Sequence, residues 1–237
     1  MERYYQIADL TVRMDTFGRT ERQAESYRCP AVTQPDICVR GNWETVQEAA
    51  PHLDRDTAEY LGTGGSFYSQ LLRHGGMMLH ASAVILDGWA YLFTAPSGTG
   101  KSTHTQLWLR QFGSRARILN DDKPALRQVD GVWYAYGTPW SGKTDWNLPQ
   151  RAPLAGICIL TRGEENRIRQ IPGNAAVGFL LSQTLRPPKK EPAGTLLELM
   201  DALLTAVPMW KLECNMEPQA ARISYEAMSA GRKEMGL

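Results

Sequence analysis

The stretch that decides the fold lies at residues 95–103 and reads APSGTGKST. It fits the pattern of a phosphate-binding loop, [GA]-x-x-x-x-G-K-[ST], with Ala95 where glycine is usual. Glycines let successive backbone N–H groups turn inward around a phosphate, and the following helix points its positive dipole end at the same anion. In such loops the lysine, here Lys101, reaches the β- and γ-phosphates, and the hydroxyl of Ser102 binds Mg²⁺.

The flanks of this stretch agree with that interpretation, because a loop of this kind joins a strand to a helix. Residues 89–94, WAYLFT, form an apolar run typical of a buried strand, and residues 103–112 form a plausible helix that closes at Gly113. The alternative is a chance glycine-rich turn before a helix. We therefore expect ATP and Mg²⁺ as ligands. The residues expected to bind the nucleotide are Ser97, Gly98, Thr99, Gly100, Lys101, Ser102 and Thr103.

Two Asp-Gly pairs predict hairpins on either side of this unit. Asp87-Gly88 separates residues 80–86 from residues 89–94, and both residues of such a pair tolerate positive φ. Asp130-Gly131 separates residues 125–127 from residues 132–136 in the same way. The strand before the loop therefore has an antiparallel neighbour. This predicts an α/β fold with a mixed sheet, unlike the parallel sheets of dinucleotide-binding folds.

Two adjacent carboxylates follow the predicted helix. Residues 118–123 read ILNDDK, so a short apolar strand ends at Asp121 and Asp122. At the edge of a sheet that also carries the loop, one acid would hold Mg²⁺ and the other would accept a proton from an attacking hydroxyl. The alternative is a solvated Asp-Asp turn.

These residues together resemble one family. A strand that begins at His80, a hairpin, a Ser-Gly-x-Gly-Lys-Ser loop and a strand that ends in Asp-Asp are the layout of HPr kinase/phosphorylase. The core is also similar to the nucleotide domain of ATP-dependent phosphoenolpyruvate carboxykinase. The resemblance spans residues 78–170. It implies that His80 lies near the transferred phosphate or the metal, that Asp121 is the base and that Asp122 is associated with the metal. It also implies a possible homo-oligomer, because related kinases assemble.

The resemblance implies a kinase that transfers the γ-phosphoryl group of ATP to a hydroxyl acceptor. We find no match to the long C-terminal lobe of the carboxykinases, and the N-terminal segment is too short and differently composed for the separate domain of full-length HPr kinases. We therefore expect the resemblance to hold for the phosphotransfer core. The acceptor therefore stays open between a peptide or protein serine, a free amino acid and a sugar-like alcohol. Two other functions remain possible: a nucleotide-binding regulatory protein without turnover, and an ATP hydrolase.

A further loop is a candidate rim for the acceptor. Residues 137–144 read GTPWSGKT, and in this loop Trp140 could stack on substrate while Lys143 could contact the γ-phosphate or an acidic acceptor. An ordinary loop with a packed Trp and a solvated Lys is the alternative. Arg162, at the end of the predicted strand 153–160, is a third candidate substrate contact, although arginines at strand ends are usually solvated.

Composition bounds the remaining functions. The 237 residues are 43% apolar and 22% charged, with a net charge of +1, which gives no electrostatic case for nucleic acid or an anionic membrane. No apolar stretch is long enough to span a bilayer, and the first residues lack the apolar core of a signal peptide. The four cysteines are scattered, as expected of reduced thiols. We therefore expect a cytoplasmic protein.

Two parts are expected along the chain. Residues 1–75 form a small α+β extension packed on the core, with strands within residues 5–14 and near residues 37–39, and a helix over residues 66–73 capped by Ser66. Residues 76–237 form the kinase core. Its C-terminal part is mostly helical, with a capping box at Thr195 that opens one helix.

Overall fold

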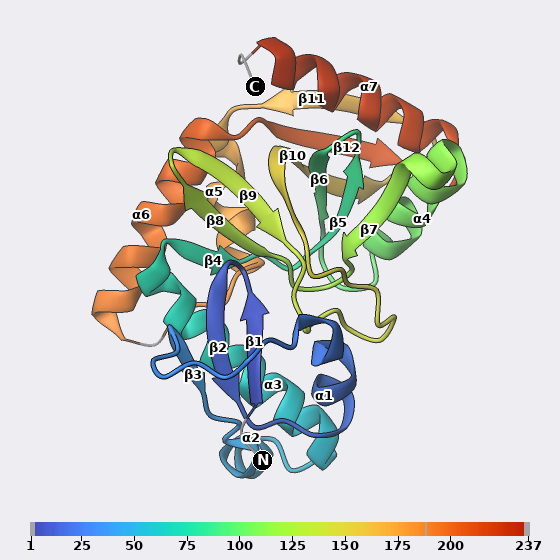
Figure 1. The fold of residues 1–237 in the computed structure, drawn as a ribbon. Helices are drawn as coiled ribbons and strands as arrows, with labels where there is room; N and C mark the ends of the chain where they lie inside the picture. The colour runs from blue at the N-terminus through green and yellow to red at the C-terminus, as the bar shows by residue number, and fades with distance from the viewer. Residues whose placement is uncertain (1–2, 188, 235–237) are drawn as a thin grey trace.

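The computed structural model describes residues 3–187 and 189–234. Its N-terminal part contains a small sheet, in which β1 pairs antiparallel with β2 and β2 pairs parallel with β3. The bounds of these strands are β1 Arg3–Ile7, β2 Leu10–Met14 and β3 Ile37–Val39. This sheet and the helices beside it lie below the large sheet in Figure 1, in blue and cyan. The strands expected within residues 5–14 and near residues 37–39 are therefore present.

The helices of the N-terminal part differ from the prediction. They are α1 Gly18–Ala24, α2 Trp43–Ala49 and α3 Arg55–Leu71, with a 3-10 turn η1 at Glu25–Tyr27. The prediction of Ser66 as a cap is wrong, because Asp54 caps α3 by accepting from the Thr57 N–H at 2.7 Å. The sequence did not predict the first turns of α3, because this helix contains several glycines and glycine is a poor helix former. Packing requires one of them: a Cβ on Gly62 would lie 1.9 Å from the carbonyl oxygen of Gly41.

The large sheet has the strand order β4-β8-β9-β10-β6-β5-β7, and β12 pairs with β10 and β11. Strand β10 is 12 residues long and joins two regions: its first residues pair antiparallel with β9, and its later residues pair parallel with β6 and β12. The strands of this sheet are β4 Gly76–Met78, β5 Ala81–Leu86, β6 Trp89–Thr94, β7 Ala116–Asn120, β8 Ala125–Val129, β9 Val132–Tyr136, β10 Arg151–Arg162, β11 Arg167–Ile171 and β12 Met209–Cys214.

The two predicted hairpins are present and explain how the site is assembled. Asp87 and Gly88 have φ of 50° and 82°, and they connect β5 to its antiparallel partner β6. Asp130 and Gly131 connect β8 to β9 in the same way. Strand β5 also pairs antiparallel with β7, so β6 and β7 run in the same direction on either side of it. The carboxyl ends of β6 and β7 therefore meet at one edge of the sheet.

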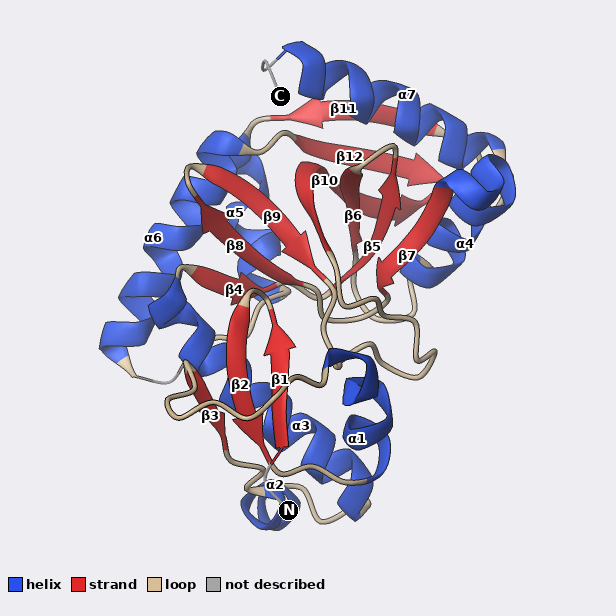
Figure 2. Ribbon diagram, viewed as in Figure 1, coloured by secondary structure: helices blue, strands red, loops and turns tan. Residues whose placement is uncertain are grey.

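Helices cover both faces of the large sheet (Figure 2). They are α4 Lys101–Phe112, α5 Gly173–Ser182, α6 Lys190–Ala206 and α7 Gln219–Glu234, with 3-10 turns η2 at Leu72–His74 and η3 at Gly113–Arg115. Side chains of α4 and α7, such as Trp108 and Met228, pack with Phe93 on one face, while Leu180 and Met200 of α5 and α6 pack with Leu92 on the other. Because both faces are buried, the central strands read as continuous apolar runs.

The C-terminal part is largely helical, as expected, and the fold is a mixed α/β fold with a mixed sheet. The capping box at Thr195 is wrong, because α6 begins at Lys190 and Thr195 lies inside it. Strand β11 was not predicted; three of its five residues, Arg167, Arg169 and Gln170, are polar and exposed at the edge of the sheet. Among residues 3–187 and 189–234, no helix is both long and apolar enough to cross a membrane.

Candidate functional site

A cavity of about 560 Å³ lies where the carboxyl ends of β6 and β7 face the N-terminal part. Three parts of the chain line it: the loop after β6 with the start of α4, the acid pair after β7, and residues 141–144. Arg19, Thr57 and Tyr60 complete it from the N-terminal part. The predicted site residues that line this cavity are His80, Ser97, Gly98, Gly100, Lys101, Ser102, Thr103, Asp121, Asp122 and Lys143.

The glycine-rich loop has the backbone that its sequence predicts. Gly98 and Gly100 have φ of 76° and 121°, and no atom lies within 4 Å of where either Cβ would be. The backbone conformation, and not a lack of space for a side chain, therefore favours glycine at these two positions. The space beside the loop is open. Ala95 is fully buried and its φ is not positive, which explains why alanine is tolerated in place of the usual glycine.

Lys101 is the buried cation of the loop. Its side chain folds back over the loop, and Nζ donates to the carbonyl oxygen of Ala95 at 3.0 Å. Burial lowers the pKa of the Lys101 ammonium, and the charges of Asp122 and Asp121 act in the opposite direction. A buried ammonium with one neutral partner has further donors for an anion.

Asp121 is buried and is held by hydroxyl groups. Its Oδ1 accepts from Ser82 Oγ at 2.6 Å, and its Oδ2 accepts from Thr144 Oγ1 at 3.0 Å. The Ser82 hydroxyl lies 2.8 Å from Thr105 Oγ1, which donates to the carbonyl oxygen of Ser102 at 3.2 Å. A hydrogen-bonded chain thus links this carboxylate to the first turn of α4.

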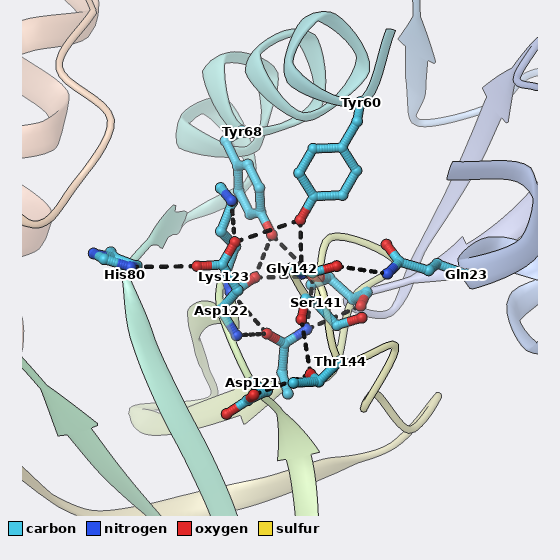
Figure 3. Close-up of polar contacts among 12 residues, drawn as sticks. Gln23, Tyr60, Tyr68, His80, Asp121, Asp122, Lys123, Ser141, Gly142 and Thr144 are labelled. Carbon is cyan, nitrogen blue, oxygen red and sulfur yellow. Dashed lines mark hydrogen bonds and ion pairs between the residues drawn. The ribbon is translucent and has the colours of Figure 1, made fainter. Parts of the chain in front are cut away.

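Asp122 is instead surrounded by an imidazole, an ammonium and a phenol group (Figure 3). Its Oδ1 lies 3.3 Å from His80 Nε2, and its Oδ2 pairs with the Lys123 ammonium and lies 3.4 Å from the Tyr60 hydroxyl. Burial alone would raise the pKa of this carboxyl group, but the hydrogen bond with His80 and the charge of Lys123 outweigh it and lower the pKa to about 2. Asp122 is therefore a persistent anion at neutral pH.

His80 is fixed from its other side as well. Its Nδ1 lies 3.1 Å from Gln183 Oε1, and its backbone N–H donates to the carbonyl oxygen of the same residue at 2.7 Å. Gln183 directly follows α5. The imidazole therefore spans the distance between the C-terminal helices and the acid pair, with Nε2 directed at Asp122 (Figure 3).

The N-terminal part reaches into the site through Tyr60 and Gln23. The Tyr60 hydroxyl accepts from the backbone N–H of Gly142 at 2.9 Å, and Gln23 Nε2 donates to the carbonyl oxygen of Gly142 at 2.9 Å. Gln23 also contacts Asp145. In Figure 3 these two side chains hold the loop beside Asp122. Gly142 has φ of 75°, and a Cβ there would lie 3.0 Å from Asp122 Cβ.

Trp140 lies outside this cavity, contrary to the suggested stacking on substrate. Its side chain is 0% exposed, stacks on Phe67 at a centroid distance of 4.9 Å and donates from Nε1 to Thr63 Oγ1 at 3.2 Å. The core therefore buries the apolar ring of Trp140 and supplies a hydrogen-bond acceptor for its indole N–H. Lys143, by contrast, is exposed and lines the cavity.

Thr99 and Arg162 line a second cavity, of about 460 Å³, on the other side of the loop. Arg162 donates to the carbonyl oxygens of Gly98 and Thr99 at 2.6 and 3.2 Å, so it braces the loop. The two cavities share Gly98, Gly100 and Thr103. The second one has an apolar wall of Leu107, Leu160 and Met216 with Asn215 among the polar residues. The shared loop joins a polar cavity to a partly apolar one.

Sequence reasoning missed several residues of the site. Ser82 had a signal, because it lies two residues after His80, and alternate residues of a strand share a face. Tyr60, Gln23 and Arg19 had none, since they belong to a separate part of the chain. Within the described ranges, no three His, Cys, Asp or Glu side chains gather as a metal cluster. Mg²⁺ bound with a nucleotide takes most of its ligands from phosphates and water, and one or two protein oxygens suffice.

Comparison with known proteins reveals similarity only at the level of structure. No protein-family model and no curated protein matches the sequence. Among solved structures, the chain is similar to the Hpr(Ser) kinase/phosphatase from Coxiella burnetii, with 13% sequence identity and a TM-score of 0.37. The match covers 64% of this chain and 97% of that one.

Proposed function

We propose that this chain is an ATP- and Mg²⁺-dependent phosphotransferase that moves the γ-phosphoryl group to a hydroxyl acceptor. The observation that carries the proposal is the shared cavity of Lys101, Asp121 and Asp122, at the end of a glycine-rich loop that starts a helix. Phosphoryl transfer needs mainly positioning and charge stabilisation, so these few groups suffice.

The loop would hold the phosphates. Backbone N–H groups of residues 97–103 and the dipole of α4 favour a bound anion, and the Lys101 ammonium would stabilise the charge that develops on the transferred group. The second cavity supports a nucleotide over a free phosphate, because it adjoins the loop at Thr103 and offers an apolar wall for a base.

The two acids have different neighbours, which supports different roles. Asp122 is a weak proton acceptor because its pKa is about 2, and a carboxylate that stays anionic suits a bound cation. Within residues 3–187 and 189–234, the Asp121 carboxylate accepts only from hydroxyl groups, and it would take the proton of the acceptor. Bound Mg²⁺ would neutralise phosphate charge, with Ser102 and Asp122 as its protein contacts.

The test is nucleotide binding by calorimetry, with ATP and Mg²⁺, on the unchanged protein and on Lys101→Ala. We expect a Kd in the micromolar range and a loss of roughly 100-fold in the variant, since a buried charged hydrogen-bond donor is removed. Lys190→Ala is the matched control, because Lys190 is an exposed lysine at the start of another helix. Equal binding by a folded Lys101→Ala protein would refute the proposal.

Turnover separates the remaining alternatives. If ATP binds but no product forms with any acceptor supplied, a regulatory nucleotide-binding protein would be favoured. Phosphate released at one rate, whatever hydroxyl compound is present, would favour a hydrolase. Phosphorylated acceptor, detected by mass spectrometry together with stoichiometric ADP, is the outcome that the proposal requires.

A further inference from the structure

Arg19 lines the large cavity from the N-terminal part, and the local packing holds it there. Its backbone N–H donates to Asp56 Oδ1 at 2.8 Å. Gly18 has φ of 56°, and a Cβ on it would lie 1.5 Å from the same oxygen. The positive φ favours glycine at this position, and the start of α1 lies directly against α3. Arg19 is thereby held at the cavity wall.

The Arg19 guanidinium offers more donors than the protein satisfies. Its central carbon lies 4.2 Å from the centre of the Tyr60 ring, and one terminal nitrogen lies 3.5 Å from Thr57 Oγ1. Nε lies 4.0 Å from Asp56 and is buried with no hydrogen-bond partner within residues 3–187 and 189–234. A guanidinium has five N–H donors in a planar fork. Donors therefore remain for a ligand in the cavity, and this fork matches carboxylate and phosphate groups.

Lys143 is a second cation that lines the same cavity. It is exposed at the rim and forms no ion pair within the part of the chain that the structure describes. Other lysines of the site are engaged: Lys123 pairs with Asp122, and under the proposed function Lys101 serves the phosphates of ATP. Arg19 and Lys143 are therefore the cations that remain for the acceptor.

We propose that the acceptor carries an anionic group, a carboxylate or a phosphate, close to its hydroxyl, and that Arg19 and Lys143 bind that group. The proposal rests on the proposed function, because it names the substrate class of the same cavity. A neutral alcohol would leave several donors of the half-buried Arg19 guanidinium without an acceptor in a filled site. Sites built to pair a polar group reject ligands that cannot pair it.

The anionic group would orient the acceptor for transfer. Its hydroxyl oxygen forms a bond to the γ-phosphorus of ATP while the bond from that phosphorus to the β–γ bridging oxygen breaks. ADP leaves with the electron pair of that bond, and the hydroxyl proton passes to Asp121. Arg19 is a substrate-binding residue in this scheme, and it lies over the ring of Tyr60, whose hydroxyl contacts Asp122.

The experiment compares matched acceptors and matched variants. Glycerate and glycerol 3-phosphate are compared with glycerol, and L-serine with L-serinamide, using ATP, Mg²⁺ and mass spectrometry of the products. The variant is Arg19→Gln. Its control is Arg55→Gln, because Arg55 belongs to the same part of the chain and lies over the Phe17 and Trp43 rings, at 4.6 and 4.4 Å, but does not line the cavity.

We expect at least one anionic acceptor to react with a kcat/KM about 10-fold or more above its neutral partner. Arg19→Gln should lower that value by about 10- to 100-fold, chiefly through the KM of the acceptor, as for a lost charged hydrogen bond, with the Kd of ATP unchanged. Arg55→Gln should change neither. The glycerate and glycerol 3-phosphate arms distinguish a carboxylate from a phosphate.

Three results would overturn the inference while the protein binds ATP normally: equal use of neutral and anionic acceptors, equal effects of Arg19→Gln and Arg55→Gln, or no transfer to any anionic member. Failure of the unchanged protein to bind ATP would instead refute the proposed function, and the inference with it. The calorimetric measurement of ATP binding distinguishes these two failures.

Discussion

The Tyr60 hydroxyl of α3 accepts a hydrogen bond from the backbone N–H of Gly142 at 2.9 Å, across 82 residues of sequence. The same hydroxyl lies 3.4 Å from Asp122 Oδ2. One side chain of the N-terminal part therefore connects the rim loop to the acid pair. Burial and the Asp122 charge raise the Tyr60 pKa, so this phenol stays protonated and can donate to the carboxylate.

The position of Gly142 beside Asp122 predicts that a side chain there would disturb the site. Gly142→Ala places a Cβ 3.0 Å from Asp122 Cβ at a φ of 75°, so we expect the loop to shift. Because water then enters a site that closes poorly, we expect a lower kcat for transfer and more ATP hydrolysis. Kinetics with and without acceptor measure both rates. Gly88→Ala is the control: its φ is 82° but its Cβ would meet no atom within 4 Å. Both variants should lose about 1–2 kcal/mol of stability, and identical kinetics in both would contradict the role of Gly142.

The acid pair should divide its roles under substitution. Asp121→Asn removes the proposed base, and we expect transfer to fall by about 10²- to 10⁴-fold while ATP still binds. Asp122→Asn removes an anion beside His80, and we expect the Mg²⁺ concentration for half-maximal rate to rise by roughly 10-fold. Magnesium titrations of both variants measure this. If Asp121→Asn shows the magnesium effect and Asp122→Asn the loss of transfer, the assignment is reversed.

Glu59 predicts a pH dependence of stability. Its carboxyl group is buried in α3, and burial raises its pKa from 4.5 to about 7, against the hydrogen bond from Thr20. The folded protein thus holds a proton that the unfolded chain releases, so this contribution is complete below pH 4.5 and is lost as the pH rises through about 7. We expect Tm to fall between pH 5 and pH 8, and Glu59→Gln to remove much of that slope. Glu48→Gln, at an exposed helical position, should leave it unchanged.

Trp140 should affect stability. Trp140→Ala removes a fully buried ring that packs on Phe67, so we expect a loss of about 3–5 kcal/mol in the free energy of unfolding. Trp146→Ala is the control in the same loop region, because Trp146 is 38% exposed. Urea titration measures both. A Trp140→Ala protein with normal stability and an altered KM for the acceptor would restore the interpretation of Trp140 as a substrate contact.

Local signals in the sequence were enough for the elements that build the centre of the fold. Each Asp-Gly pair identified a hairpin because only a few residue types tolerate positive φ at both positions, and the glycine-rich run identified the loop before α4. The acid pair could be placed at a strand end from the apolar run before it. These features depend on residues within a few positions of one another, so they can be seen without the tertiary structure.

Only the tertiary structure decided which side chains face the cavity. The glycine-rich loop and the acid pair lie at the same end of the sheet because β6 and β7 are both antiparallel to β5. The Asp87-Gly88 pattern specified the pairing of β5 with β6, but no local pattern specifies the pairing of β5 with β7. Trp140 is buried because Phe67 and Thr63 of α3 receive it. Arg19 reaches the site because the start of α1 contacts Asp56 of α3. Such contacts join residues far apart in sequence, and their energies depend on packing and burial that spacing along the chain does not contain.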